Sequence, residues 1–426
     1  MNIKKLAGNR AEEVGIHRFL NNDDVTQDEI EGSFNVKTIK NIRNLEDILV
    51  INDTTEVSFP SQKQKKASFG STGNRHGNGF FMHPNIVVNP KNGCILGLAG
   101  VEIWQRTEIN TKKLRHKKPL EKKESYKWIR ALEKAQRYLG AIKRKTFVTD
   151  RESDIYEYMN FVKKGGDHFI VRAMHNRKIE EENTYLKDYI SKKEVLQTYE
   201  LLIKETPKRK SRLGKLHVKY GRLNICRPQN IIDKTHYDEK LTVSYVDIQE
   251  DDSTAPDKKS KIHWLLLTTY EIDTPEDAID VIERYKLRWT IELIFAASKK
   301  RGLDIESCQI TDFDKLKKLV TLAILSVIQV FYLVKARDGK DDISAQIIFS
   351  DDEIVFLGVM LKTLEGKTQK QKNLYLKGGT SWASWIISRL GGWKGYASER
   401  APGYGTIHHG LQKFYNMYQG WKMWNV

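Results

Sequence analysis

Four residues of this chain stand at helical spacing and carry side chains that bind metal ions and phosphate. Tyr285, Arg288, Glu292 and Lys299 follow one another at intervals of three, four and seven residues. At about 100° per residue, a helix places all four within an arc of roughly 60°. That face would combine a carboxylate for a metal ion with a guanidinium, an ammonium and a phenol for phosphate.

An exposed stripe of salt bridges is the alternative interpretation, because Glu pairs with Arg or Lys at this spacing on ordinary helices. Four apolar residues, however, are expected on the same side of the helix: Ile282, Trp289, Leu293 and Ala296. They predict that the face is partly buried, and a buried ion needs a partner. We therefore expect a metal ion at Glu292 and phosphate at Arg288 and Lys299, with Tyr285 adding a hydrogen bond to phosphate.

Two aspartates each follow a predicted strand. Asp53 comes directly after the apolar stretch 48–52, and Asp150 comes directly after 146–149. Taken singly, each is more typical of a turn or a cap. Together with Glu292 they supply three carboxylates, enough to hold two Mg²⁺ ions, or Mn²⁺ in their place. Two such ions about 4 Å apart promote in-line phosphoryl displacement, so these three acids are expected to be both the catalytic residues and the metal ligands.

The pattern around these acids indicates how the chain would bring them together. Strands are predicted at 48–52, 85–88 and 94–104, then a helix over 121–139, a strand over 146–149, a helix over 153–162 and a strand over 168–173. A later helix is predicted from Thr274, its N-cap, and Pro275, its first residue, to about residue 301. Three antiparallel strands, a helix and a further strand, with acids ending the first and fourth strands, are typical of a ribonuclease-H-like α/β fold.

The charge balance favours an anionic partner. The chain has 72 Lys and Arg against 55 Asp and Glu, a formal net charge of +17 and a pI near 9.4. Nucleic acid is the commonest partner of such a chain, although charge spread over a solvated surface is the alternative. Basic runs at 62–66, 112–118 and 208–215 would follow the phosphate backbone of double-stranded DNA.

Cysteine usage and hydropathy exclude other classes. Only Cys94, Cys226 and Cys308 are present, which excludes a disulfide framework and a zinc site of paired cysteines and fits a reducing compartment. The first residues lack the apolar run of a signal peptide. The longest apolar stretch, 319–334, has 16 residues, shorter than the roughly 20 that a bilayer span needs. We expect a buried core helix there, no membrane association, and a cytoplasmic protein associated with the nucleoid.

Four segments of this sequence resemble the DDE transposases of bacterial insertion sequences, specifically the IS-four group that includes the Tn-five transposase. They are Asn52-Asp53-Thr54-Thr55, the stretch 149–155 around Asp150, the strand 264–268 that starts with Trp264, and the signature Tyr-x2-Arg-x3-Glu-x6-Lys from Tyr285 to Lys299. Weaker similarity at 124–128 and 389–393 extends the resemblance over nearly the whole chain.

The resemblance implies roles for two further residues. Trp264 would stack on a base flipped out of the transposon end, and Arg172 would contact the DNA. Without the resemblance, Trp264 is more typical of a core tryptophan that starts an apolar strand. The implied activity is cut-and-paste transposition by nicking, hairpin formation and strand transfer, carried out by a homodimer assembled on transposon ends and target DNA.

The resemblance also implies a domain organisation. Residues 1–44 would be the remnant of an N-terminal DNA-end-binding domain, 45–176 the first part of the ribonuclease-H-like core, 177–270 a β-rich insertion, 271–334 the second part of the core with the catalytic helix, and 335–426 a helical dimerisation region. The segment 18–22 resembles a part that family members place well inside their N-terminal domain. The alternative function is therefore a truncated, non-transposing remnant or inhibitor that binds DNA or dimerises, and a third is a nuclease that cuts without strand transfer.

Overall fold

The computed structural model describes residues 3–7, 9–59, 69–73, 77–106, 119–140, 142–203, 210–232, 234–257, 261–299, 303–339, 343–396 and 399–424. The basic runs expected at 62–66 and 112–118, and the first two residues of the run at 208–215, lie outside these ranges.

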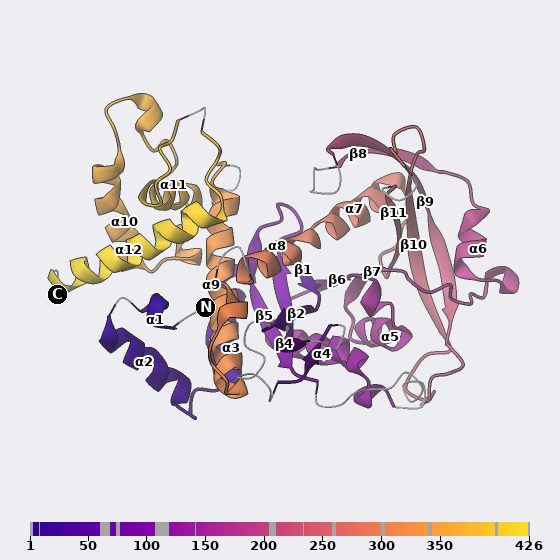
Figure 1. Cartoon of the computed structure of the whole chain (residues 1–426). Coiled ribbons are helices and arrows are strands. Elements are labelled where there is room, and N and C mark those ends of the chain that lie inside the picture. Colours follow the sequence, from indigo (N-terminus) through magenta and orange to yellow (C-terminus); the bar gives the residue numbers. More distant parts are fainter. Residues whose placement is uncertain are drawn as a thin grey trace.

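One mixed β-sheet forms the centre of the protein (Figure 1). Its strands are β1 (Asp47–Asn52), β2 (Thr55–Ser58), β3 (Ser71–Thr72), β4 (Gly77–Val88), β5 (Ile95–Trp104), β6 (Arg144–Thr149), β7 (His168–Arg172), β8 (Gln197–Ile203), β9 (Arg212–Cys226), β10 (Lys240–Glu250) and β11 (His263–Thr268). Within the described ranges the strand order is β2-β4-β1-β6-β7-β11-β10-β9-β8, and β3 and β5 both pair with β4. The fold is thus mixed α/β with a large sheet.

The strands expected in the first half of the chain are present. β1 is antiparallel to β4 and β4 to β5, whereas β1, β6 and β7 run parallel to one another. β4 starts at Gly77, well before the expected start at residue 85. Glycines and Pro84 interrupt the strand pattern there, and pairing with β2 and β5 on its two sides keeps this part of the chain extended.

The β-rich stretch after residue 177 continues the same sheet. β11 pairs antiparallel with β7, β10 with β11, β9 with β10, and β8 with β9 at the far edge. The alternating pattern in this stretch predicted strands, whereas their union with the central sheet depends on the long-range contact between β7 and β11.

Helices cover both faces of the sheet. They are α1 (Ile3–Leu6), α2 (Arg10–Asn21), α3 (Gln27–Ile42), α4 (Lys127–Leu139), α5 (Tyr156–Lys164), α6 (Leu186–Ser191), α7 (Pro275–Lys286), α8 (Trp289–Ser298), α9 (Phe313–Ala336), α10 (Asp351–Leu364), α11 (Thr380–Leu390) and α12 (Tyr404–Trp424). Figure 1 shows α4 and α5 on one face of the sheet and α7 and α8 on the other, with α9 standing beside α3.

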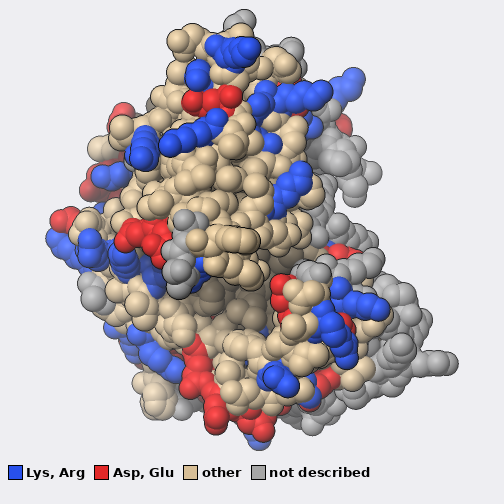
Figure 2. All heavy atoms as spheres, turned by 90° about the vertical axis from the view of Figure 1, so that its left-hand side faces the viewer, with Lys and Arg blue, Asp and Glu red and all other residues tan. Residues whose placement is uncertain are grey.

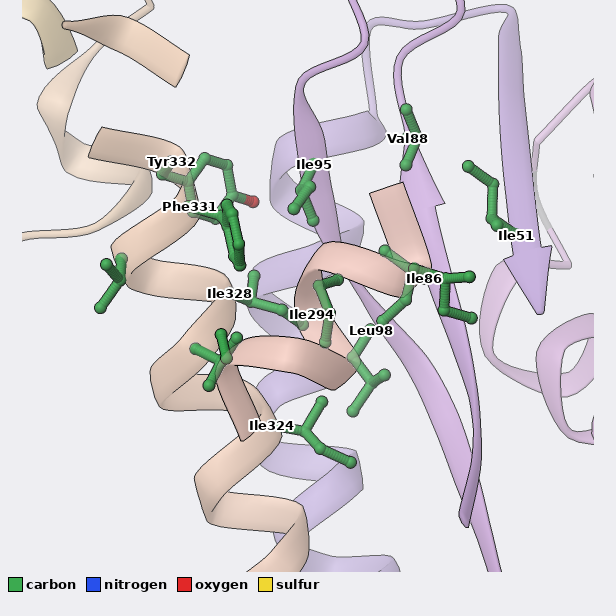
Figure 3. Close-up of a cluster of buried hydrophobic side chains, with 14 of the residues drawn as sticks. Ile51, Ile86, Val88, Ile95, Leu98, Ile294, Ile324, Ile328, Phe331 and Tyr332 are labelled. Atoms are coloured by element: carbon green, nitrogen blue, oxygen red, sulfur yellow. The ribbon is translucent and has the colours of Figure 1, made fainter. Parts of the chain in front are cut away.

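The side chains of β1 alternate between two hydrophobic cores. Leu49 and Ile51 belong to the core that includes α8 and α9, whereas Ile48 and Val50 belong to the core that includes Trp128 of α4. This is the period of two that a strand buried on both faces requires. Figure 3 shows Ile294 of α8 between the sheet and α9, where it packs among Ile86, Leu98 and Ile324.

The apolar stretch expected as a core helix lies in α9, which has 24 residues and is longer than expected. By length and composition α9 is apolar enough to cross a membrane, but 67% of its most apolar window is buried inside the protein. Leu316, Val320, Ile324 and Val327 are among its fully or nearly fully buried residues. The apolar side chains of α9 therefore serve the core of this fold.

The helices before β1 and after α9 pack on this core. The Lys318 ammonium of α9 donates to the carbonyls of Leu20 (3.2 Å) and Asn22 (2.9 Å) at the end of α2. Beyond α9, Trp382 and Trp385 of α11 are buried, so these two aromatic residues serve packing. Figure 2 shows the face turned to the left in Figure 1, where Lys, Arg, Asp and Glu are interspersed around a wide area of uncharged residues.

Candidate active site

Asp53 and Asp150 lie side by side, each directly after the end of one of two parallel strands. The register pairs Ile51 of β1 with Val148 of β6, so Asp53 and Asp150, each two residues further on, stand opposite each other. Ile51 and Val148 belong to the same core, which places both aspartates on the face covered by α8 and α9. Neighbouring strands lie about 4.8 Å apart, so the two carboxylates are close neighbours.

Arg172 extends this row onto the next strand. β6 pairs Thr149 with Val171 of β7, so the following residues, Asp150 and Arg172, also stand opposite each other. The Arg172 Nη2 donates to the His263 carbonyl at 2.7 Å, which holds the guanidinium beside β11. The ends of three parallel strands thus place two acids and one arginine on one face.

The helix expected from Thr274 to about residue 301 is two helices, so that prediction is wrong in its length. Thr274 caps α7 through a capping box with Asp277, and Pro275 is the first helical residue, as expected. At Leu287 and Arg288, between α7 and α8, the backbone N–H groups bond to carbonyls three residues back, which tightens the turn and interrupts the α-helical pattern. α8 ends at Ser298, and Lys299 follows as its C-cap.

Two apolar residues that were expected to bury this face are exposed. Trp289 is 57% exposed and Leu293 is 41% exposed, so the expectation is wrong for both. The core side of α8 consists of Ile291, Ile294 and Phe295 instead. Because the helix is interrupted at residues 287–288, helical periodicity counted from α7 does not carry over unchanged into α8.

Arg288 joins two of the three acids. Its Nη1 lies 2.9 Å from Oδ2 of Asp53 and 3.5 Å from Oε1 of Glu292, the residue one turn along α8. Because a single nitrogen contacts both carboxylates, Asp53 and Glu292 face each other across one guanidinium. The other carboxylate oxygen of Asp53, Oδ1, accepts the backbone N–H of Thr54 at 2.7 Å.

The surroundings of Asp53 change its acidity. Burial raises its pKa to about 6, the positive charge of Arg288 and the N–H of Thr54 oppose this rise, and the negative charges of Glu292 and Asp150 add to it. Removal from water is therefore the main reason that this carboxyl group holds its proton more tightly than usual.

Tyr285 and Trp264 border the acids on the side of Arg172. The Tyr285 ring is buried, and it packs against Trp264 with ring centroids 5.5 Å apart at an angle of 62°. Burial and the negative charge of Asp150 raise the pKa of the Tyr285 phenol, so it stays protonated and can donate a hydrogen bond. The structure brings Tyr285, Trp264 and Arg172 together, and their contacts with DNA stay predictions.

The site residues suit a hard divalent cation in the type of their donors. All three acids offer carboxylate oxygens, which Mg²⁺ and Mn²⁺ prefer. Oδ1 of Asp150 is buried and has no hydrogen-bond partner within the described ranges. Among the described residues no group of three His, Cys, Asp or Glu side chains is placed to hold a metal ion, and Arg288 contacts both Asp53 and Glu292.

Sequence reasoning missed the polar side chains that support β1 from the other face of the sheet. Asn52 donates to Oδ1 of Asn85 at 2.8 Å, and Asn85 donates to the carbonyl of Ala131 in α4 at 2.8 Å. The Thr54 hydroxyl lies 2.9 Å from Nδ1 of the buried His83. The signal that was overlooked is the alternation of polar His83 and Asn85 within an otherwise apolar strand.

The fold and the site together define a class of protein, a mixed α/β protein that gathers acids and arginines at the ends of parallel strands. Comparison with known families gives a specific match: the family model described as a transposase DDE domain covers residues 44–328. This is about two thirds of the chain, and the chain belongs to this family. Membership gives it a transposase function with DNA as its partner, and DDE transposases generally use divalent metal ions.

Proposed function

We propose that this protein catalyses cut-and-paste transposition of an insertion sequence of the IS-four group, with Asp53, Asp150 and Glu292 as its catalytic metal ligands. The observation that carries the proposal is the alignment of Asp53 with Asp150 at the ends of adjacent parallel strands, together with the single Arg288 nitrogen that contacts both Asp53 and Glu292. The core strands, in the order β5-β4-β1-β6-β7 with the first three antiparallel, support a ribonuclease-H-like fold for this catalytic centre.

The proposed chemistry is a series of phosphoryl transfers at each transposon end. Water attacks one strand, the freed 3′-hydroxyl attacks the opposite strand to form a hairpin, and after the hairpin is reopened the 3′-hydroxyl joins target DNA. When bound to the three carboxylates, Mg²⁺ or Mn²⁺ would help to deprotonate the attacking oxygen and would stabilise the leaving oxygen. No separate protein base is then required.

The other residues of the site bind and orient DNA in this proposal. Arg288 and Arg172 would pair with phosphate, with Lys299 as an additional point charge and the protonated Tyr285 as a hydrogen-bond donor. Trp264, which is half-buried against Tyr285, would stack on a base extruded from the duplex.

The C-terminal helices are proposed to form the dimer contact when the protein assembles on DNA. Val355 and Val359 of α10 and Met423 and Trp424 of α12 are exposed apolar side chains. These side chains would become buried if a second copy of the chain packed against α10 and α12. Light scattering of the protein with and without end DNA measures this assembly.

A cleavage assay tests the proposed function. Purified protein is mixed with Mg²⁺ or Mn²⁺ and labelled DNA carrying the element's own ends. Wild-type protein should give nicked, hairpin and joined products, and Glu292→Ala should abolish all three. Glu276→Ala, at an exposed position in the first turn of α7, is the matched control and should keep them.

Each alternative gives a different result in this assay. Nicking without hairpins or joined products would favour a nuclease. End binding or dimerisation without any cleavage would favour a non-transposing remnant or inhibitor.

A further inference from the structure

A chain of contacts runs from the core behind the sheet to the carboxylate of Asp53. The Trp128 and His83 rings meet edge to face, with centroids 4.5 Å apart and an angle of 89°. His83 Nδ1 lies 2.9 Å from the Thr54 hydroxyl, and the Thr54 backbone N–H donates to Oδ1 of Asp53 at 2.7 Å. We propose that His83 is a positioning residue that orients Asp53 through Thr54.

The strand pairing shows why Asp53 needs such support. Asn52 pairs with Asn85 and Thr55 with Met82, so Asp53 and Thr54 stand opposite Pro84 and His83. Neither Asp53 nor Thr54 belongs to a strand, and Pro84 has no backbone N–H for a neighbouring strand. The bond between the Thr54 and His83 side chains therefore holds the backbone at a point where strand pairing is interrupted.

Successive side chains in this segment lie on opposite faces of the sheet, so the proposed metal ligand and the residues that support it are on different faces. Asp53 lies on the face covered by α8, whereas Thr54 and His83 lie on the face covered by α4, where Trp128 is fully buried. His83 thus never meets substrate, and its influence on the reaction passes through the backbone N–H of Thr54. With Arg288 on Oδ2 and Thr54 on Oδ1, both oxygens of Asp53 have a defined orientation.

The His83 imidazole keeps a single charge state, which suits a residue that only positions its neighbour. His83 is completely buried, and burial together with the positive charges of Lys127 and Arg130 holds its pKa well below the ordinary value, so the ring is neutral. Its Nε2 has no hydrogen-bond partner among the described residues. In either neutral tautomer Nδ1 can bond to the Thr54 hydroxyl, so the contact does not depend on which nitrogen holds the proton.

The inference rests on the proposed function, because it assigns Asp53 to a metal site. It is tested by the affinity for Mn²⁺, measured by electron paramagnetic resonance on the whole protein without DNA. Removing an outer partner of a metal ligand typically weakens metal binding by about 10- to 100-fold. His83→Leu and Thr54→Val should each cause a loss of this size, and the double variant should lose no more than the larger single loss.

Conservative and control variants separate positioning from general packing. His83→Asn keeps a polar atom near the place of Nδ1, and Thr54→Ser keeps the hydroxyl, so both should restore most of the Mn²⁺ affinity. His168→Leu is the matched control, because His168 Nδ1 also contacts a threonine hydroxyl, that of Thr269 at 3.0 Å, but at the opposite end of β7 from Arg172. It should leave the Mn²⁺ affinity unchanged.

Several outcomes would overturn the inference. A folded His83→Leu protein with wild-type Mn²⁺ affinity would do so, and so would an equal loss in His168→Leu. If His83→Leu does not fold, Thr54→Val decides by the same criterion. Wild-type protein that binds no Mn²⁺ would overturn the metal site and this inference together, whereas protein that binds Mn²⁺ but never joins DNA would overturn only the proposed function.

Discussion

Asp53 and Asp150 stand opposite each other, each one residue past the end of one of two adjacent parallel strands. Two buried strands therefore set the spacing of these carboxylates, whereas Glu292 reaches them from a helix packed on the same face. The positions of the two aspartates depend on the sheet, and the position of Glu292 depends on how α8 packs.

The first prediction concerns stability and pH in the absence of metal. The pKa of Asp53 is about 6 in the folded protein against an ordinary value of 3.8, so the folded state binds more protons between these values. Stability should therefore fall as the pH rises from about 4 to 6. Asp53→Asn removes this loss and should stabilise the protein at pH 7.5 by on the order of 1–3 kcal/mol, with no difference below about pH 4.

Thermal unfolding in EDTA at pH 4 and pH 7.5 measures this difference. Asp352→Asn, at an exposed position in the first turn of α10, serves as the control. An equal stabilisation by Asp53→Asn at both pH values would contradict the prediction.

The second prediction concerns metal affinity. A carboxylate must lose its proton to bind a metal ion, so protons compete with Mn²⁺ below the pKa of Asp53. The affinity should fall by up to about tenfold for each pH unit below 6 and should level off above it. Calorimetric titration with Mn²⁺ from pH 5 to pH 8 checks this. A flat profile across pH 6 would show that Asp53 does not bind the ion.

The third prediction concerns Arg288. Its charge is the largest influence that lowers the pKa of Asp53, so Arg288→Gln should raise that pKa further and move the acid limb of Mn²⁺ binding to higher pH. The same change should weaken the binding of end DNA and reduce its salt dependence, because a phosphate contact is lost. Arg288→Lys keeps the positive charge but lacks the planar guanidinium. It should therefore change the pH at which Mn²⁺ binding weakens only slightly. Equal pH profiles for the Gln variant and wild-type protein would contradict this account.

The fourth prediction concerns the packing of α8. Ile294 is fully buried between the sheet and α9, so Ile294→Ala should lower the free energy of unfolding by about 2–5 kcal/mol. Because Ile294 anchors the helix that carries Glu292, the variant should also lose Mn²⁺ affinity at temperatures where it is folded. Leu293→Ala, its 41% exposed neighbour, should change stability by less than about 1 kcal/mol. Urea unfolding of both variants provides the comparison.

Much of the site was predictable because its signals are local. An apolar strand that ends in an acid is visible in a few residues, as at Asp53 and Asp150, and the spacing of Arg288 and Glu292 predicts their proximity within one helical turn. The start of α7 at Thr274 and Pro275 was predictable for the same reason, since a capping box involves residues three positions apart.

The sequence by itself determined which residue types are present and indicated most of the strands and the helix start that carry the site, because apolar runs and helix caps are local signals. Tertiary structure decided the rest. The register between β1 and β6 aligns Asp53 with Asp150, the break at Arg288 turns Trp289 to solvent, and the contact between His83 and Thr54 crosses from one strand to another. These relationships join residues far apart in the chain, and they depend on how whole elements pack.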